Sequence, residues 1–78
     1  MVKITKAKAK AVGNKMGLDW KKYDLKEFRI GLEIEQEHEK TTKGDLMLVG
    51  QTAVDHLNEF PDYYTEFVKW EKQMERRH

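Results

Sequence analysis

Apolar residues recur at helical spacing along most of this chain, and no segment alternates apolar and polar residues convincingly with the period of a strand. Asp24, Asp45 and Pro61 divide the pattern. Aspartate accepts hydrogen bonds from the free N–H groups that begin a helix, and proline suits a first helical turn. Asp24 and Glu27 also have the spacing of a capping box. The chain therefore predicts three helices, over residues 25–39, 46–60 and 61–77.

A shorter helix is predicted before these three. The Lys-Ala alternation at residues 6–10 favours helix, and Gly17 is expected to end it. Its narrow apolar stripe consists of Thr5, Ala9, Val12 and Met16. Residues 1–5 are expected to be a frayed end. Together these elements predict an all-α fold, a single domain over residues 1–78 built as a small bundle of three to four short helices.

The size and composition of the chain limit its chemistry. With 78 residues there is room for one domain with a modest core. Cysteine is absent, which excludes disulfides, thiolate metal sites and thiol enzymes. The chain has no apolar run of the length of a membrane span, and residues 1–6 lack the apolar core of a signal peptide. We therefore expect a soluble, cytoplasmic protein with no membrane partner.

One carboxylate interrupts the apolar face of the helix predicted over residues 25–39. On a helical wheel Glu35 falls roughly 20° from Phe28, and His38 falls on the same side, near Gly31. A buried carboxylate is unfavourable unless it is paired, coordinated or protonated. His38, one turn further on, is the first candidate for its partner.

The following helices carry related polar residues. His56 lies at the edge of the next apolar face, close to Val49, with Glu59 one turn on. Tyr63 is expected to point inward at the start of the last helix, where its phenol would reach whichever polar cluster forms. Gly31 and Gly50 lie on inner faces and are predicted to let two helices approach closely. In the last helix one apolar stripe is formed by Tyr63, Phe67, Trp70 and Met74.

Three interpretations of the polar residues are open. In the first, Glu35, His38 and His56, with Tyr63 or Glu59, bind one divalent metal ion such as Zn, Fe or Mn. Glu-x-x-His is the spacing used in di-iron bundles, although those bundles use more carboxylates. In the second, Glu35 and His38 are a buried hydrogen-bonded pair that fixes helix register. In the third they are a catalytic acid–base pair that works without metal.

The charges of the chain are unevenly distributed. Residues 1–22 carry a net charge of +6, residues 23–71 carry −7 and residues 72–78 carry +2. A basic head would steer the protein to nucleic acid or to an acidic partner, and aromatic residues Trp20 and Tyr23 flank two of its lysines. The alternative is that the lysines solvate the N-terminus while the aromatic rings cover a small core. The candidate nucleic-acid contacts are Lys6, Lys8, Lys10, Lys21 and Lys22.

Three segments resemble a known family. They are residues 16–32, which contain Gly-Leu-Asp-Trp, then Glu-Gln-Glu-His at 35–38, and His-Leu-Asn-Glu-Phe-Pro-Asp-Tyr-Tyr at 56–64. Together they are similar to a family of short bacterial and phage proteins classed as a domain of unknown function. The resemblance implies a bacterial or phage origin and no established activity. In the family a glycine usually follows the Glu-x-Glu-His segment, where this chain has Glu39. The family's polar motif residues fall on Glu35, Glu37, His38, His56, Asp62, Tyr63 and Tyr64.

The function that these observations favour is that of a small, non-enzymatic binding protein with a protein partner and a structural or metal-binding Glu/His cluster. One alternative is a small metal-dependent enzyme using Glu35, His38 and His56. A second alternative is a nucleic-acid binder that uses the lysine-rich N-terminal segment. Phosphate-binding glycine loops, nucleophile elbows and EF-hand patterns are absent from the sequence.

Overall fold

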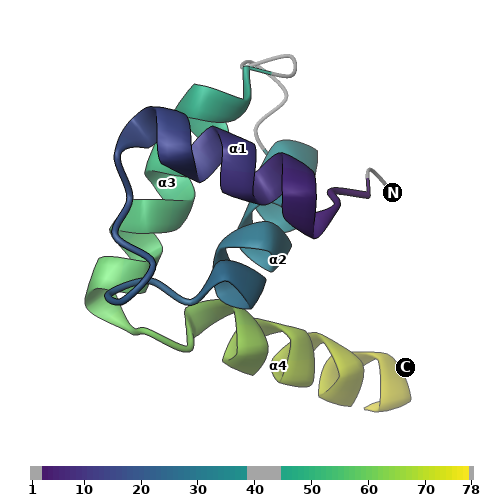
Figure 1. Ribbon diagram of the computed structural model, residues 1–78. Coiled ribbons are helices and arrows are strands. Elements are labelled where there is room, and N and C mark those ends of the chain that lie inside the picture. The colour runs from purple at the N-terminus through teal and green to yellow at the C-terminus, as the bar shows by residue number, and fades with distance from the viewer. Residues whose placement is uncertain (1–2, 39–44, 78) are drawn as a thin grey trace.

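The computed structural model describes residues 3–38 and 45–77, and within these ranges it confirms the predicted all-α fold and contains no strand. The four helices are α1 (Lys6–Met16), α2 (Leu25–His38), α3 (Leu46–Glu59) and α4 (Tyr63–Arg77). In Figure 1, α1 crosses α2 and α3, while α4 runs along one end and its C-terminal half extends past the others. Across the described ranges, no helix is long and apolar enough to span a membrane. The predicted loop over residues 40–44 lies outside the described residues.

The ends of the first three helices follow from local hydrogen bonds. The Thr5 side chain accepts from the N–H of Lys8 and begins α1, and Gly17, with a φ of 77°, ends α1 as predicted. Asp24 accepts from the N–H of Glu27 at 3.1 Å and begins α2. Asp45 accepts from two backbone N–H groups at the start of α3, which confirms its predicted role as N-cap.

The start of α4 differs slightly from the prediction. Pro61 and Asp62 form a turn, and the helix begins two residues later, at Tyr63. The N–H of Tyr63 donates to the carbonyl of Phe60 at 3.0 Å, so the chain turns before the helical hydrogen bonds begin. Proline therefore acts here as a turn residue that precedes the helix.

The core of the molecule is built mainly by the chain before α4. Among the described residues, the buried apolar side chains are Ile4, Ala9, Val12, Phe28, Leu32, Val49, Ala53, Val54, Leu57 and Tyr64. Ile4 precedes α1, and its N–H donates to Glu33 of α2 at 2.7 Å, which holds this segment against the bundle. Residues 1–2 lie outside the described part of the chain. Tyr64 is the one member of this set that α4 supplies, so α4 takes little part in the core.

Two glycines set the distances between helices, as the sequence predicts. A Cβ atom added to Gly50 would lie 2.7 Å from the sulfur of Met16, so α3 and the end of α1 approach closely. A Cβ added to Gly31 would lie 2.5 Å from the ring of Tyr64. Both distances are shorter than van der Waals contact, so a side chain at Gly31 would displace the ring of Tyr64 and one at Gly50 would require Met16 to move. Gly31 therefore provides the space in which Tyr64 docks on α2.

The aromatic stripe of α4 does not point into the core. Tyr64 is fully buried, whereas Trp70 is 55% exposed, and Phe60 at the end of α3 is 60% exposed. Phe60 falls on the predicted apolar face of α3, yet it lies beyond the last turn that packs on the bundle. α4 packs through the neighbouring side of the helix, around Tyr64, because Gly31 and Glu35 of α2 accommodate that side chain's ring and hydroxyl.

Candidate functional site

Three polar side chains from three helices meet beneath α4, and we call them the polar network: Glu35, His56 and Tyr64. The Tyr64 hydroxyl donates to Oε1 of Glu35 at 3.2 Å. Nδ1 of His56 lies 3.0 Å from the Tyr64 oxygen and 3.2 Å from the same Glu35 oxygen. Glu35 is 7% exposed, so the carboxylate is buried and has the partners that burial demands.

The protonation of the network follows from its geometry. Burial, together with the charge and hydrogen bond of Glu35, raises the pKa of the Tyr64 hydroxyl far above its ordinary value. Tyr64 therefore stays neutral and keeps the proton that it donates to Glu35. Because the Tyr64 proton is used in this way, Nδ1 of His56 must carry a hydrogen to bond either oxygen. The arrangement is a carboxylate with two donors, so the buried charge of Glu35 is satisfied by hydrogen bonds.

Tyr63 connects this network to the surface. Its ring stacks on the ring of His56, with centroids 4.4 Å apart and planes inclined by 9°. It also packs edge-on against Tyr64, with centroids 4.9 Å apart. Tyr63 is half-buried and thus fixed from below by the polar network. The structure brings together the predicted residues Glu35, His56 and Tyr63, although Tyr63 contributes its ring to this contact.

A second buried carboxylate of α2 holds the start of α4. Glu27 is 6% exposed and accepts from the backbone N–H of Thr65 through both oxygens, at 3.2 and 3.1 Å. It also accepts from the Thr65 hydroxyl. Thr65 lies in the first turn of α4, where free N–H groups and the helix dipole favour a negative charge. Glu27 thus serves a different helix from the one whose capping box it was predicted to complete.

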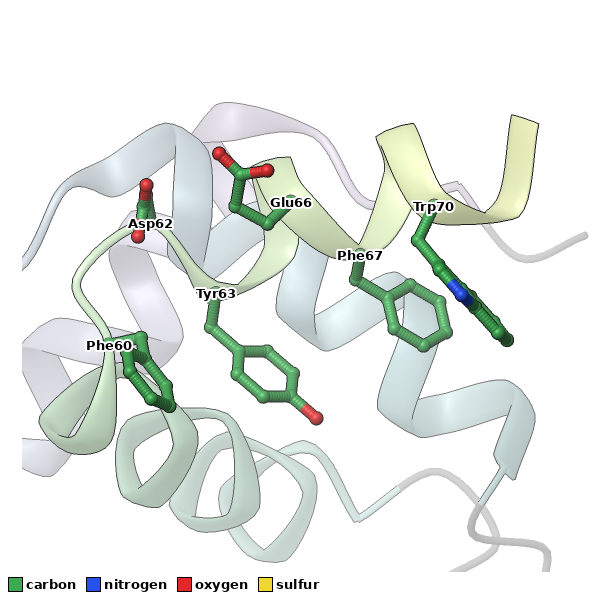
Figure 2. Close-up of a pocket in the computed structure, with 6 residues that line it drawn as sticks. All are labelled: Phe60, Asp62, Tyr63, Glu66, Phe67 and Trp70. Atoms are coloured by element: carbon green, nitrogen blue, oxygen red, sulfur yellow. The ribbon is translucent and has the colours of Figure 1, made fainter. Parts of the chain in front are cut away.

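An apolar surface lies beside these contacts, and we call it the aromatic face. Figure 2 shows its four rings in a row along one side of the chain from the end of α3 into α4: Phe60, Tyr63, Phe67 and Trp70. They line an open pocket of about 350 Å³, which Asp62 and Glu66 also line. The rings of Phe67 and Trp70 are 6.1 Å apart. A row of partly exposed rings with a carboxylate rim is a surface suited to binding.

Comparison of the sequence with models of protein families identifies the family of this chain. The family model described as "Protein of unknown function (DUF5661)" matches residues 9–73. The chain belongs to the DUF5661 family. No curated protein and no solved structure matches it. The match includes all three segments on which the resemblance in sequence was based.

The fourth residue predicted for a metal site in this DUF5661 chain is His38. It is the last residue of α2, and its side chain lies outside the part of the chain that the structure describes. Within the described part, no group of three or more acidic, histidine or cysteine side chains is placed to hold a metal ion. The donors that Glu35 shows are Tyr64 and His56, which come from α4 and α3. Metal binding by Glu35, His38, His56 and Tyr63 stays a prediction.

The lysines predicted to contact nucleic acid lie on the surface of this family member. Lys6, Lys8, Lys10, Lys21 and Lys22 are all exposed. The neighbouring aromatic rings pack inward. Trp20 lies against Gly13 and edge-on to Phe28, and its Nε1 donates to Asn14 at 2.9 Å. The Tyr23 hydroxyl donates to Asn58 at 2.7 Å. These rings therefore cover the core, as in the alternative that the sequence left open. Nucleic-acid binding by the five lysines stays a prediction.

Two residues of the site were missed by helical periodicity. Tyr64 follows the predicted stripe by one position, and its role depends on the space at Gly31. Glu27 had a local explanation as a capping residue, which concealed its contact with Thr65. The family resemblance could have indicated Tyr64, because Tyr63 and Tyr64 belong to the family segment at residues 56–64. No sequence signal that we can name distinguishes Glu27 from an ordinary first-turn acid.

Proposed function

We propose that this protein is a small interaction module that binds an amphipathic helix of a partner protein along the aromatic face. The observation that carries this proposal is the exposure of two large rings, Trp70 on α4 and Phe60 just before it, beside contacts that anchor the start of α4. Trp70 and Phe60 are more than half exposed, although a chain of this size has few large apolar side chains with which to build its core. Exposed apolar surface that is not used for folding marks an interaction site.

The spacing of the rings favours a helix as the occupant. Tyr63, Phe67, Trp70 and Met74 are separated by four, three and four residues, which is the spacing of a coiled-coil seam. A partner helix with apolar residues at the same spacing would lay its side chains between these rings. The C-terminal half of α4 extends past the other helices, which leaves room for such a neighbour (Figure 1).

The charges beside the seam disfavour a second copy as the parallel partner. Glu66 and Glu71 occupy the two positions that flank a seam, before and after the central pair Phe67 and Trp70. Parallel pairing of two copies of α4 would bring Glu66 of one copy towards Glu71 of the other, and like charges at flanking positions repel. A partner from another protein avoids this repulsion.

The anchor beneath the face gives it a fixed shape. Tyr63 is stacked on His56, and the start of α4 is held by Glu27 and Glu35. A preorganised surface loses less conformational entropy when it binds. We therefore assign the polar network a structural role in this proposal. The cytoplasmic location and the bacterial or phage origin that the sequence predicts complete it.

A designed peptide tests the proposal. The probe is a peptide of about three heptads with leucine at the seam positions and glutamine at the flanking positions. Titration calorimetry should detect binding to the wild type, and Trp70→Ala should weaken it by about 30-fold, as expected for a central tryptophan. Leu48→Ala, which removes an exposed leucine of α3, is the matched control and should bind as the wild type does.

Three outcomes would overturn the proposal. The first is the absence of peptide binding, and the second is equal weakening by Trp70→Ala and Leu48→Ala. The third is a stable wild-type dimer in light scattering that Trp70→Ala converts to a monomer. That third result would make the aromatic face a contact between copies of this chain.

A further inference from the structure

A second groove lies on the adjacent side of α4, between α4 and α2. It has a volume of about 280 Å³. Its apolar lining comes from both helices and consists of Ile30, Ile34, Phe67 and Val68. Phe67 also lines the pocket of the aromatic face, so both depressions border this residue.

Carboxylates from both helices line this groove. On α4, Tyr64 and Val68 pack toward α2, and the same side of the helix continues with Glu71 and Glu75, at seven and eleven residues after Tyr64. The carboxylates that line the groove are Glu33, Glu37, Glu71 and Glu75. If this face of α4 served only to pack against α2, apolar or basic residues would be expected at positions 71 and 75. The carboxylates found there do not favour packing of the C-terminal half of α4 against the carboxylates of α2.

The groove retains negative charge. Glu33 is engaged, because it lies 3.3 Å from Nη1 of Arg29 and also accepts from the N–H of Ile4. Within the described residues no ion pair involves Glu37, Glu71 or Glu75.

Among the described side chains, the bases next to Glu71 and Glu75 in the sequence lie on a different side of α4. Lys72 and Arg76 each follow a groove carboxylate by one residue, which turns them about 100° away around the helix. The field of the carboxylates is concentrated by the apolar walls of the groove.

We infer that this groove is the receptor for a lysine or arginine side chain of the same partner helix, an inference that rests on the proposed function. A long cationic side chain fits both parts of the lining. Its methylene stem would cover Ile34, Val68 and Phe67, and its charged end would lie among Glu37, Glu71 and Glu75. The partner is thus a basic amphipathic helix, with its apolar face on the rings and its cations over the groove.

Three peptides with the same leucine seam test this assignment. Their flanking positions carry lysine, glutamine or glutamate. At low salt the lysine peptide should bind the wild type about tenfold or more tightly than the glutamine peptide, and the glutamate peptide should bind weakest. Added salt should reduce the lysine preference, because the carboxylates are near the surface and are screened.

Charge-neutralising variants locate the effect. The double variant Glu71→Gln/Glu75→Gln should bring the lysine and glutamine peptides to within about twofold of each other. The control Asp55→Asn/Glu59→Gln changes the net charge equally at exposed positions of α3 and should retain the lysine preference. Glu33 is left intact because it holds the N-terminal segment.

The outcomes separate this inference from the proposed function. If the glutamine peptide binds, Trp70→Ala abolishes its binding, and lysine brings no advantage, the aromatic face is a binding site and the cation receptor is refuted. If the α3 control loses the lysine preference as fully as the groove variant does, the effect comes from net charge and the receptor is again refuted. If none of the three peptides binds, both proposals fail.

Discussion

α4 and the three helices before it are held in the molecule by different forces. α1, α2 and α3 share a core of aliphatic and aromatic side chains and approach closely at Gly50. α4 contributes Tyr64 to that core and is otherwise held at its start, where buried carboxylates of α2 bind Tyr64 and Thr65. Of its apolar stripe, Tyr63, Phe67 and Met74 are partly buried and Trp70 is exposed. A bundle can thus complete its core with three helices and keep the rings of a fourth for binding.

The two regions also differ in the kind of contact that holds their helices in place. Apolar burial stabilises in proportion to area and needs no particular geometry. Buried carboxylates stabilise only when their donors are correctly placed, and they fix one arrangement. α4 is held by the second kind, which explains how a helix with few core contacts keeps a defined position.

The largest effect should come from the shared core. Phe28 is fully buried, and Phe28→Ala should lower the free energy of unfolding by about 3–5 kcal/mol. That loss approaches the whole stability of a domain of this size, so the variant should be largely unfolded in far-UV circular dichroism. Trp70→Ala removes a larger but exposed ring and should change the free energy of unfolding by at most about 0.5 kcal/mol. Similar losses in both variants would show that the aromatic face belongs to the core.

A smaller effect is expected from the polar network. Glu35→Gln removes the negative charge of the carboxylate that Tyr64 and His56 contact. It should lower the free energy of unfolding by about 1–3 kcal/mol. If the cluster is structural, thermal melts of tag-free protein should show the same loss in EDTA and with added Zn, Mn, Fe or Ni. A wild type that gains stability with metal, through Glu35, would instead support the predicted metal site. Equal melting of the two proteins under all conditions would contradict both interpretations.

The smallest effect concerns alkaline pH. The pKa of Tyr64 is raised by folding, so above the ordinary tyrosine pKa of about 10 the unfolded state releases a proton that the folded state keeps. The Tyr64 contribution is thus fully present below pH 10 and decreases above it, by at most about 1.4 kcal/mol per pH unit.

Denaturant titrations between pH 8 and pH 11 should therefore show a steeper alkaline loss of stability for the wild type than for Tyr64→Phe. Because the variant keeps Tyr23 and Tyr63, the difference between the two curves isolates the contribution of Tyr64. Parallel curves would mean that the Tyr64 hydroxyl is not held as the structure shows.

Much of the fold could be predicted from residue types and spacing. Gly17, Asp24 and Asp45 act at helix ends through bonds to their immediate neighbours, so their roles depend on local sequence. Thr5, which the sequence placed in the apolar stripe of the first helix, is instead the exposed N-cap of α1. The buried faces of α2 and α3, including the unusual carboxylate Glu35, follow from the 3.6-residue period.

The partners of Glu35 could be found only in part in this way. The i, i+3 spacing indicated His38, whose side chain lies outside the described part of the chain, and His56 was a candidate for the same cluster. The donor that the helical spacing did not indicate is Tyr64, whose ring fills the space that Gly31 leaves. The stripe of α4 was visible in the sequence, but its exposure depends on which side of α4 faces α2.

The sequence by itself determined four helical segments, most of their ends, the burial of a carboxylate and membership of the DUF5661 family. These properties depend on neighbours within one or two turns, or on the pattern of residue types along the chain. Only the tertiary structure decided that Glu27 and Glu35 hold α4, that its rings form an open face and that acids line the groove beside α2. Those arrangements depend on how α4 rotates as it docks, and that rotation is set by contacts between residues far apart in the sequence.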